Sequence, residues 1–453
     1  MKILEKTLLS GFALLLFLFY LPIAALAAEN DDPLKILMIT GGGPWHDYEV
    51  QKKQLEDGLK ERIANIEITI DHEPLVGDAT DVKFARHETT DWAKEFDLVI
   101  YNQCHLDIND TEYVDRIINA HVEYQVPAVM LHCAFHAYRD YSENWYNFIG
   151  GRSHRHEGHI PFTVETLEPE HPIMVNFPRS WRTPHGELYM PLELSKGAVP
   201  LARAYGILTD TFYPVAWTYE YYGVRVFNNT LGHHDETMGH DVNLNLVASG
   251  LLWAAGKLQD DGSPAPGYEG ERGLGWISLT DGETLNGWRA SETTDWFQAR
   301  RANWPSADNT GTESFWVRDN NIVVSGQHSN LFYEGSIQGG DFINFEFKSD
   351  IYSYNNSQTG IFFHTRFQDK GTPKYGHQVQ FAARGDDPQG EHEWLTFHVK
   401  MKNGELQTLT ESGLLSNISA LEHTLNRGTI ALHSSSPNSR TYFRNILIRL
   451  WPD

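Results

Sequence analysis

Cysteine is scarce in this chain: only Cys104 and Cys133 occur among its 453 residues. This excludes the disulfide framework that holds many small exported domains together, so the folds must be stabilised by hydrophobic cores. Cys104 follows a predicted strand over residues 97–102, and Cys133 follows another over residues 127–132. The two cysteines either form a single disulfide, if those strands are neighbours, or remain two buried thiols.

Positive charge is also in short supply. The chain has 36 Lys and Arg against 60 Asp and Glu, a formal net charge of -24, and no run of five basic residues. The electrostatic footprint of a nucleic-acid-binding protein is therefore missing, so nucleic acid is not expected as a partner. Anionic membrane surfaces are equally poor partners.

Long apolar runs are absent except at the N-terminus. Two lysines precede an apolar stretch over residues 8–26, which ends in an Ala-Leu-Ala pattern at 25–27. This arrangement is typical of a secretory signal peptide over residues 1–27. A retained anchor is the alternative, but Pro22 and the cleavage pattern interrupt the run before it reaches spanning length. The mature protein is therefore expected to be periplasmic or extracellular, with no membrane span.

A stretch rich in Gly, Pro and Asp divides the rest of the chain, and we interpret residues 259–273 as a linker. Before it, residues 34–258 alternate short apolar runs with helical patterns, which predicts an α/β domain with a parallel sheet covered on both faces. After it, residues 274–453 show many short aromatic and β-branched runs, which predict an all-β sandwich or jelly roll. The expected strands of the first domain are residues 35–40, 66–71, 97–102 and 127–132, and its expected helices are residues 49–64, 111–123 and 243–256.

Histidine follows three of these predicted strands. The loops read GGGPWHD at 41–47, QCH at 103–105 and HCAFH at 132–136. Ligands of open parallel sheets bind outside the carboxyl ends of the strands, so these loops are expected to meet at one edge. The glycines either let the backbone approach a ligand or form a tight turn.

Known nucleotide and metalloprotease signatures are missing from these loops: there is no GxGxxG, no GK[ST] and no HExxH. More histidines and carboxylates come downstream, in GGRSHRHEGH at 150–159, PHGELY at 184–189 and LGHHDE at 231–236. Imidazoles and carboxylates can bind a divalent metal or move protons near neutral pH. Any one of these histidines could be structural, but the set indicates a functional site.

The same segments carry a family resemblance. VMLHCAFHAY at 129–138, FIGGRSHRHEGH at 148–159, GELYM at 186–190 and the run at 214–237 resemble, in order and spacing, the motifs of the ThuA-like, trehalose-utilisation family. This resemblance implies a flavodoxin-like fold related to class I glutamine amidotransferases, and a link to 3-keto-glycosides. Where that family usually has Asp-Glu-Leu-Tyr, this chain has Gly186-Glu187-Leu188-Tyr189, so one carboxylate is missing.

The second domain resembles another family. GWISLTDGETLNGW at 275–288 and the last two predicted strands are similar to the 3-keto-disaccharide hydrolase domain, which implies a concanavalin-like sandwich. Its central motifs depart from the family pattern: His364 stands where an Arg is usual, and His377 where a Glu is usual. The role of that Glu therefore cannot be carried over, and the domain either uses His377 for proton transfer or only binds sugar.

These observations predict an exported carbohydrate-active enzyme that cleaves keto-glycosides by acid/base chemistry, either elimination and hydration or hydrolysis. A non-catalytic carbohydrate-binding protein is the alternative, and an acyl-transfer enzyme that uses Cys133 is a third. A divalent metal ion is the cofactor considered, with His132, His136 and His233 as candidate ligands. The catalytic candidates are His132, His136, Glu187, His233, Asp235 and His377; the substrate-binding candidates are Gly42, Gly43, Trp45, His46, Arg152, His156, Tyr189, Trp316, His364, Arg366 and Gln380.

Overall fold

The computed structural model describes ten stretches of the chain. Residues 33–453 form one compact unit, and the predicted signal peptide lies outside the described residues. Within the described stretches, no helix combines the length and the apolar character needed to cross a bilayer. The stretches are residues 32–75, 77–138, 143–190, 192–291, 314–326, 328–353, 358–381, 394–410, 415–436 and 439–452.

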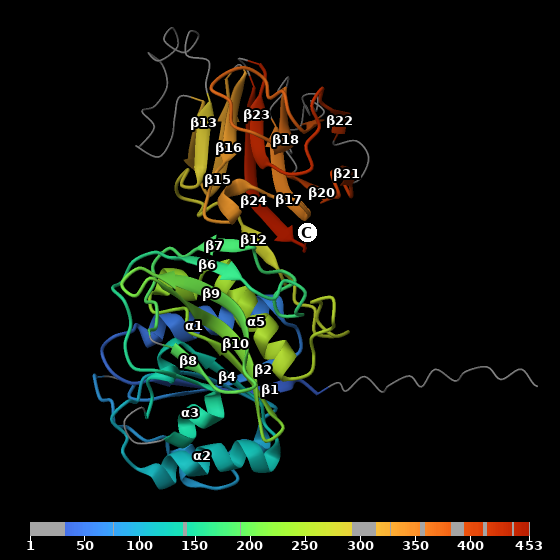
Figure 1. Ribbon diagram of the computed structural model, residues 1–453. Coiled ribbons are helices and arrows are strands. Elements are labelled where there is room, and N and C mark those ends of the chain that lie inside the picture. The colour runs from blue at the N-terminus through green and yellow to red at the C-terminus, as the bar shows by residue number, and fades with distance from the viewer. Residues whose placement is uncertain are drawn as a thin grey trace, which may run out of the picture. The chain divides into compact units, whose positions relative to one another are not determined.

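A nine-stranded sheet forms the first domain (Figure 1). Its five parallel strands include all four strands predicted from the sequence. The sheet is mostly parallel, as predicted, and four antiparallel strands extend it. In order across the sheet, the strands are β2 (Ile66–His72), β1 (Leu34–Gly41), β3 (Leu98–Gln103), β4 (Ala128–Leu131), β11 (Val224–Asn229), β10 (Thr211–Tyr221), β9 (Val199–Gly206), β6 (Thr163–Thr166) and β7 (Ser180–Arg182).

A two-residue turn explains where the sheet changes direction. Tyr221 at the end of β10 pairs with Val224 at the start of β11, and the turn residues Tyr222 and Gly223 have φ of 48° and 85°. Two consecutive positive φ angles are typical of the tight hairpin turn. Such a turn can join only antiparallel strands, whereas parallel strands need a long crossover.

Helices cover both faces of the parallel strands (Figure 1). Helices α1 (Tyr48–Arg62) and α5 (Asp241–Ala254) pack together on one face, and α2 (Thr111–Tyr124) and α3 (Glu143–Ile149) on the other. The three predicted helices are confirmed, with ends that differ by at most two residues. α1 begins where it does because Asp47 caps it, accepting a hydrogen bond from the Val50 amide at 3.1 Å. His46 is thereby left in the loop, at the carboxyl edge of the sheet.

The segment interpreted as a linker is hydrogen-bonded to the end of α1. The Arg272 amide donates to Glu61 O at 3.0 Å, and the Ala64 amide donates to Tyr268 O at 3.1 Å. The breaker-rich composition of residues 259–273 therefore marks a change of fold class rather than a free tether. The domain boundaries themselves stay a prediction.

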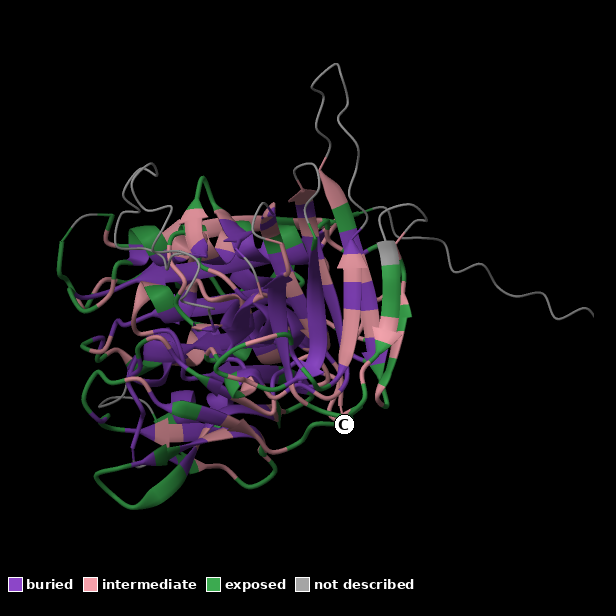
Figure 2. Cartoon of the chain, turned by 90° about the horizontal axis from the view of Figure 1, so that it is seen from above, coloured by how far each residue is buried: buried purple, intermediate pink, exposed green. Residues whose placement is uncertain are grey.

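Two antiparallel sheets form the second domain, as predicted. Phe347 and Phe397 of one sheet contact Phe363 of the other, with ring centroids 5.3 and 6.3 Å apart, so the sheets pack face to face. Figure 2 shows the buried strands of the core surrounded by more exposed segments. One sheet contains β12 (Trp276–Ser278), β14 (Phe315–Arg318), β15 (Asn321–Ser325), β17 (Phe345–Ser353), β20 (Leu395–Lys402), β21 (Glu405–Thr408) and β24 (Arg440–Leu450); the other contains β13 (Trp288–Ser291), β16 (Ser329–Tyr333), β18 (Thr359–Thr365), β19 (His377–Phe381), β22 (Leu415–Ala420) and β23 (Thr429–Ser434).

Candidate functional site

His132 occupies an unusual backbone position at the end of β4. The strand ends at Leu131, and His132 begins a 3-10 turn (His132–Phe135) with φ of 41°. Non-glycine residues seldom adopt positive φ, and such residues are concentrated at functional sites. The side chain is buried, and its Nδ1 lies 2.8 Å from the carbonyl oxygen of Thr230, which follows β11. The turn therefore holds one imidazole firmly at the carboxyl edge of the sheet.

Two further strand-end loops bring histidines to the same place. His46 follows β1 and His233 follows β11, and their ring centroids lie 4.6 Å apart. The ring centroid of His132 is 4.9 Å from that of His46 and 5.3 Å from that of His233. The sheet topology thus gathers three imidazoles from distant parts of the chain: His46 and His132 follow predicted strands, whereas His233 follows β11, which the sequence analysis did not predict.

A carboxylate lies at the centre of this group. Glu187 Oε2 is 3.1 Å from His132 Nε2 and 3.2 Å from His233 Nδ1. Its other oxygen, Oε1, is 3.1 Å from both His156 Nδ1 and His159 Nε2. We call these residues the Glu187 cluster: Glu187, His46, His132, His156, His159 and His233.

Backbone pairing positions Glu187 against the histidine-rich loop. The Glu157 amide donates to Leu188 O and the Met190 amide donates to Arg155 O, both at 2.8 Å. β5 (Gly151–Ser153) and β8 (Leu192–Leu194) continue this antiparallel pairing. The register sets His156 opposite Tyr189, so the two histidines of the loop reach the neighbouring Glu187.

The cluster has a buried floor and an exposed rim. The side chains of His132 and Glu187 are 2% and 6% exposed, whereas those of His156 and His159 are 40% and 46% exposed. Burial by itself would raise the pKa of Glu187, but hydrogen bonds with His132 and His233 hold that pKa well below its usual range. Glu187 is therefore ionised at neutral pH.

The same surroundings keep His46 neutral. Burial, and then the proximity of His132 and His233, lower the pKa of His46 well below its usual value. For His234, which follows the cluster in sequence, burial and the neighbouring His233 and His159 also lower the pKa. Neutral imidazoles each have one nitrogen that can accept a proton or a metal ion.

Two other predicted residues line the floor. Tyr189 places its hydroxyl 3.3 Å from His132 Nε2, and the ring of His136 stacks on the Tyr189 ring at a centroid distance of 4.3 Å. His136 is buried. His136 therefore packs against Tyr189. Among the described residues, it belongs to no group of three side chains whose donor atoms could hold a metal ion.

The remaining candidates of the first domain lie around the cluster without entering it. Gly42 packs against the backbone of Cys104, and the Gly43 amide donates to Ala79 O at 3.1 Å, so both glycines lie close against other loops. Trp45 is about half exposed. Arg152 forms an ion pair with Glu143 at 3.0 Å. Burial raises the pKa of Asp235, which hydrogen-bonds to Gln51.

The candidates of the second domain do not converge. His364 is buried, with its two ring nitrogens 3.0 and 2.9 Å from the carbonyl oxygens of Leu425 and Ile343, which favours a structural role. His377 Nε2 contacts Gly404 O at 3.0 Å, and Gln380 follows it by three positions in β19. An odd separation along a strand directs two side chains to opposite faces. Arg366 is exposed near the Tyr375 ring, and Trp316 belongs to the other sheet.

Sequence reasoning left His159, His185 and His234 out of the site. His159 contacts Glu187 directly. The ring of His234 lies 5.1 Å from that of His159 and 5.0 Å from that of His185. The dense HRHEGH run was the available signal for His159. In contrast, His105, which belongs to the third strand-end loop, is buried against Gln103 and the Glu73 carbonyl.

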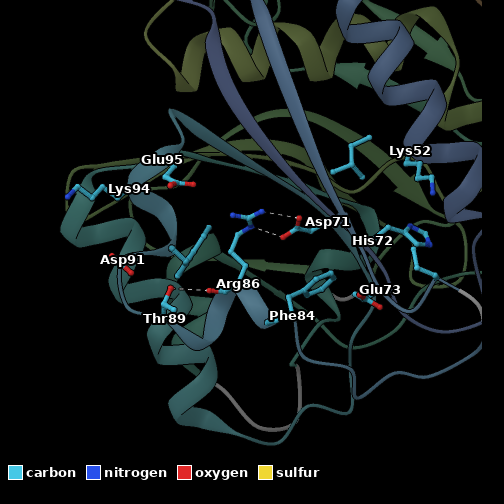
Figure 3. Close-up of a pocket in the computed structure, with 14 residues that line it drawn as sticks. Lys52, Asp71, His72, Glu73, Phe84, Arg86, Thr89, Asp91, Lys94 and Glu95 are labelled. Atoms are coloured by element: carbon cyan, nitrogen blue, oxygen red, sulfur yellow. Dashed lines mark hydrogen bonds and ion pairs between the residues drawn. The ribbon is translucent and has the colours of Figure 1, made fainter.

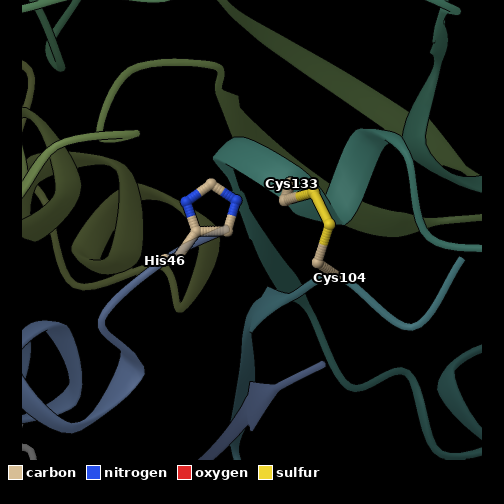
Figure 4. Close-up of side chains that lie close together, drawn as sticks. All are labelled: His46, Cys104 and Cys133. Carbon is tan, nitrogen blue, oxygen red and sulfur yellow. A yellow bond between two sulfur atoms is a disulfide. The ribbon is translucent and has the colours of Figure 1, made fainter. Parts of the chain in front are cut away.

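The two cysteines form a disulfide beside the cluster. Cys104 and Cys133 have Cα atoms 5.0 Å apart and link the loops after β3 and β4, with His46 next to them (Figure 4). Of the two alternatives for the cysteines, the structure has the disulfide. A thiolate nucleophile at Cys133 is therefore not available in this state, which counts against the acyl-transfer hypothesis.

A separate hollow of about 1120 Å³ lies near the end of β2 (Figure 3). Its lining includes Asp71, His72 and Arg86, and no member of the Glu187 cluster. Arg86 is paired with Asp71 at 2.7 Å. A chemical site needs convergent groups with perturbed ionisation, which the cluster provides.

Several triads in the cluster, one of them completed by the adjacent His234, have donor atoms close enough to share a cation. These are His46, His132 and His233; His159, His233 and His234; and His156, His159 and Glu187, with ligand atoms within 4.8 Å of one another in each triad. The cluster can therefore move protons, bind a cation, or do both.

Comparison with protein families identifies two successive domains. The ThuA family model, described as trehalose utilisation, matches residues 36–254. A model described as a 3-keto-alpha-glucoside-1,2-lyase-like domain matches residues 275–392. No curated protein gives a significant match.

Among solved structures, a thua-like protein from Parabacteroides merdae is 18% identical, with a TM-score of 0.41, over 53% of this chain and 98% of its own. The carbohydrate deacetylase Agd3 is 10% identical, with a TM-score of 0.33, over 49% of this chain and 33% of its own. A glycosyl hydrolase from Parabacteroides distasonis is 14% identical, with a TM-score of 0.24, over 36% of this chain and 100% of its own.

Proposed function

Because this chain joins a ThuA domain to a 3-keto-alpha-glucoside-1,2-lyase-like domain, we propose that it is a carbohydrate-active enzyme that cleaves keto-sugar glycosides at the Glu187 cluster. The observation that carries the proposal is the buried carboxylate of Glu187, which contacts four imidazoles, two of them at an exposed rim. A carboxylate that orients a histidine is a recurrent arrangement in acid/base catalysis.

The chemistry of a 3-keto-glycoside fits such a site. The ketone acidifies the hydrogen on the neighbouring C2, so a base can remove that proton to give an enolate. The electron pair of the enolate then forms the C1–C2 double bond as the C1–O glycosidic bond breaks, and the leaving oxygen takes a proton from an acid. Addition of water across the double bond gives the free keto-sugar. The enzyme must therefore supply one base and one acid.

We assign the proton transfers to His156 and His159. Both side chains are exposed at the rim, and each contacts Glu187 Oε1 through one nitrogen, which leaves its second nitrogen on the other side of the ring. Glu187 is the positioning residue: its depressed pKa makes it a weak base, but its charge stabilises a protonated imidazole beside it.

The protein is proposed to act outside the cytoplasm, in the periplasm or the extracellular space. The support for this is the sequence pattern of residues 1–27, with two lysines, an apolar stretch and a small-residue cleavage pattern. To test this, the full-length chain is expressed, and the N-terminal sequence of the protein recovered outside the cytoplasm is determined. Recovered protein that still begins at residue 1 contradicts the proposal that residues 1–27 are a cleaved signal peptide.

A non-catalytic carbohydrate-binding protein is the second candidate. It is favoured by the second domain, where His377 replaces the usual Glu and hydrogen-bonds to the backbone of Gly404. Incubation of the mature protein with 3-keto-trehalose and other 3-keto-glycosides, followed by NMR, separates the two candidates. We expect release of free sugar; binding without turnover on all of them would establish the second candidate instead.

A further inference from the structure

We propose that His132, His233 and Glu187 bind a divalent transition-metal ion, with His46 as a neighbouring fourth donor. The proposed metal site uses the same cluster as the proposed function but does not depend on it, because the arguments below concern only the protein's own atoms. The floor of the cluster, rather than its rim, is where the ion would bind.

The donor atoms have the spacing of a metal coordination sphere. Glu187 Oε2, His132 Nε2 and His233 Nδ1 form a nearly equilateral triangle with sides of 3.1, 3.2 and 3.3 Å. Ligands about 2.0–2.1 Å from a tetrahedral zinc ion are separated by about 3.3–3.4 Å. A two-histidine, one-carboxylate triad is also a ligand set that other first-row divalent ions accept.

Hydrogen-bond accounting calls for a proton or a metal ion at this triangle. His132 Nδ1 lies 2.8 Å from the Thr230 carbonyl, which can only accept, so Nδ1 carries the hydrogen. In a neutral imidazole Nε2 then presents a lone pair, yet it faces the carboxylate oxygen of Glu187 at 3.1 Å. Two lone pairs at that distance repel unless a proton or a metal ion lies between them.

The surroundings favour a metal ion over a proton. His46 Nδ1 contacts the carbonyl oxygen of His233 at 3.4 Å, and its metal-capable nitrogen lies within 4.8 Å of those of His132 and His233. Backbone carbonyls thus orient both His46 and His132, as the second sphere of a metal site does for its histidines. One carboxylate and three imidazoles would leave a bound divalent ion with a net positive charge, suited to polarising a sugar oxygen.

The test is metal binding by the full mature chain in the absence of any sugar. The protein is stripped with chelator and titrated with Zn²⁺ or Co²⁺, and the bound ion is measured by elemental analysis after dialysis. We expect about one ion per chain, and visible Co²⁺ absorption bands that report nitrogen and oxygen ligands. Wild-type protein that retains neither ion overturns the proposal.

Variants locate the ion. Glu187→Gln keeps the shape of the side chain, and His233→Ala removes one donor; each should weaken binding at least about tenfold, since even loss of an outer-sphere partner costs that much. His154→Ala is the control, because His154 is exposed and lies outside the cluster, in the loop that contains His156 and His159. This variant should bind the ion like the wild type. Unchanged affinity in both cluster variants overturns the site, and the Co²⁺ spectrum of the wild type decides the matter if a variant does not fold.

The proposed function is judged separately. Because the titration contains no sugar, an absent ion overturns only the metal site, and the keto-glycoside assay still decides the activity. A bound ion together with no turnover overturns only the proposed activity and leaves the metal site standing.

Discussion

At the scale of single residues, Glu187 determines how the cluster is charged. Burial works against its ionisation, and hydrogen bonds with His132 and His233 overcome that penalty, so its pKa is lowered. A neutral amide at this position has nearly the same shape but cannot stabilise a protonated imidazole. The charge of residue 187, rather than its volume, should therefore govern catalysis.

We expect Glu187→Gln to lower kcat on a 3-keto-glycoside by about 10²- to 10⁴-fold, the usual contribution of positioned acid/base groups. Steady-state kinetics by NMR or a coupled sugar assay measures this. The matched control is Glu165→Gln, because Glu165 is a partly exposed carboxylate that pairs with Arg203 and not with a member of the cluster. Equal kcat in the two variants would contradict the assignment.

His132 combines a side chain of the cluster with a strained backbone. Its φ of 41° lies in the left-handed region, where a glycine is at ease and an alanine is not. Both His132→Gly and His132→Ala remove the imidazole, so the two variants differ only in backbone preference.

We therefore expect His132→Gly to be more stable than His132→Ala by about 1 kcal/mol. Urea denaturation of the two variants, followed by circular dichroism, gives the difference in the free energy of unfolding. The reverse order, with alanine the more stable, would show that the turn relaxes out of the left-handed conformation once the imidazole is lost.

At the scale of elements, the loops after β3 and β4 are joined by the disulfide between Cys104 and Cys133, which are 29 residues apart. Neither cysteine lies in regular strand structure, so the bond restrains loops that the sheet itself does not hold. One of these loops contains the His132 turn. The disulfide should therefore affect both stability and the precision of the site.

Removing the disulfide in a Cys104→Ala/Cys133→Ala double variant should cost about 3–4 kcal/mol of stability, from the chain entropy of closing a loop of this length. Urea unfolding with and without reductant measures the effect: reductant should destabilise the wild type and leave the double variant unchanged. A wild type insensitive to reductant, once thiol titration shows that the bond is reduced, would contradict this.

Some strands of the first domain could be predicted from the sequence, and others could not. Residues 35–40 and 97–102 were recognisable as strands because continuous apolar runs are typical of buried parallel strands. The β10–β11 hairpin was missed, since its turn has Tyr222 and Gly223 rather than the common Asn-Gly signal. As a result, the antiparallel half of the sheet was not anticipated.

At the scale of the whole molecule, several histidines outside the cluster are buried in the two domains. Burial is the main cause that lowers the pKa of His87 to about 3 and the pKa values of His105, His121 and His433 to about 4. These histidines are neutral in the folded protein but take up a proton in the unfolded chain near pH 6.5.

Stability should therefore be complete above about pH 6.5 and fall as the pH drops toward 4, because the unfolded state binds protons that the folded state refuses. Each fully buried histidine can contribute up to about 2 kcal/mol of this loss between pH 6.5 and pH 5. Thermal melting across this range measures it. His154→Ala, which changes an exposed histidine, should keep the wild-type dependence, and a melting temperature that rises toward pH 5 would contradict the prediction.

The sequence by itself determined the two fold classes, the four parallel strands and the fact that histidine-rich loops follow them. These features depend on local patterns of apolar, turn and β-branched residues, which are legible within a few positions of the chain. The family motifs added their order and a link to sugars.

Only the tertiary structure decided which of those histidines meet. His132 and His233 are 101 residues apart in sequence, yet their ring nitrogens lie 3.3 Å apart because β4 and β11 are neighbouring parallel strands. The same packing buried His105 and His364 as structural residues and brought His159 to Glu187. Long-range strand pairing, which no local pattern encodes, therefore separates the site residues from the rest.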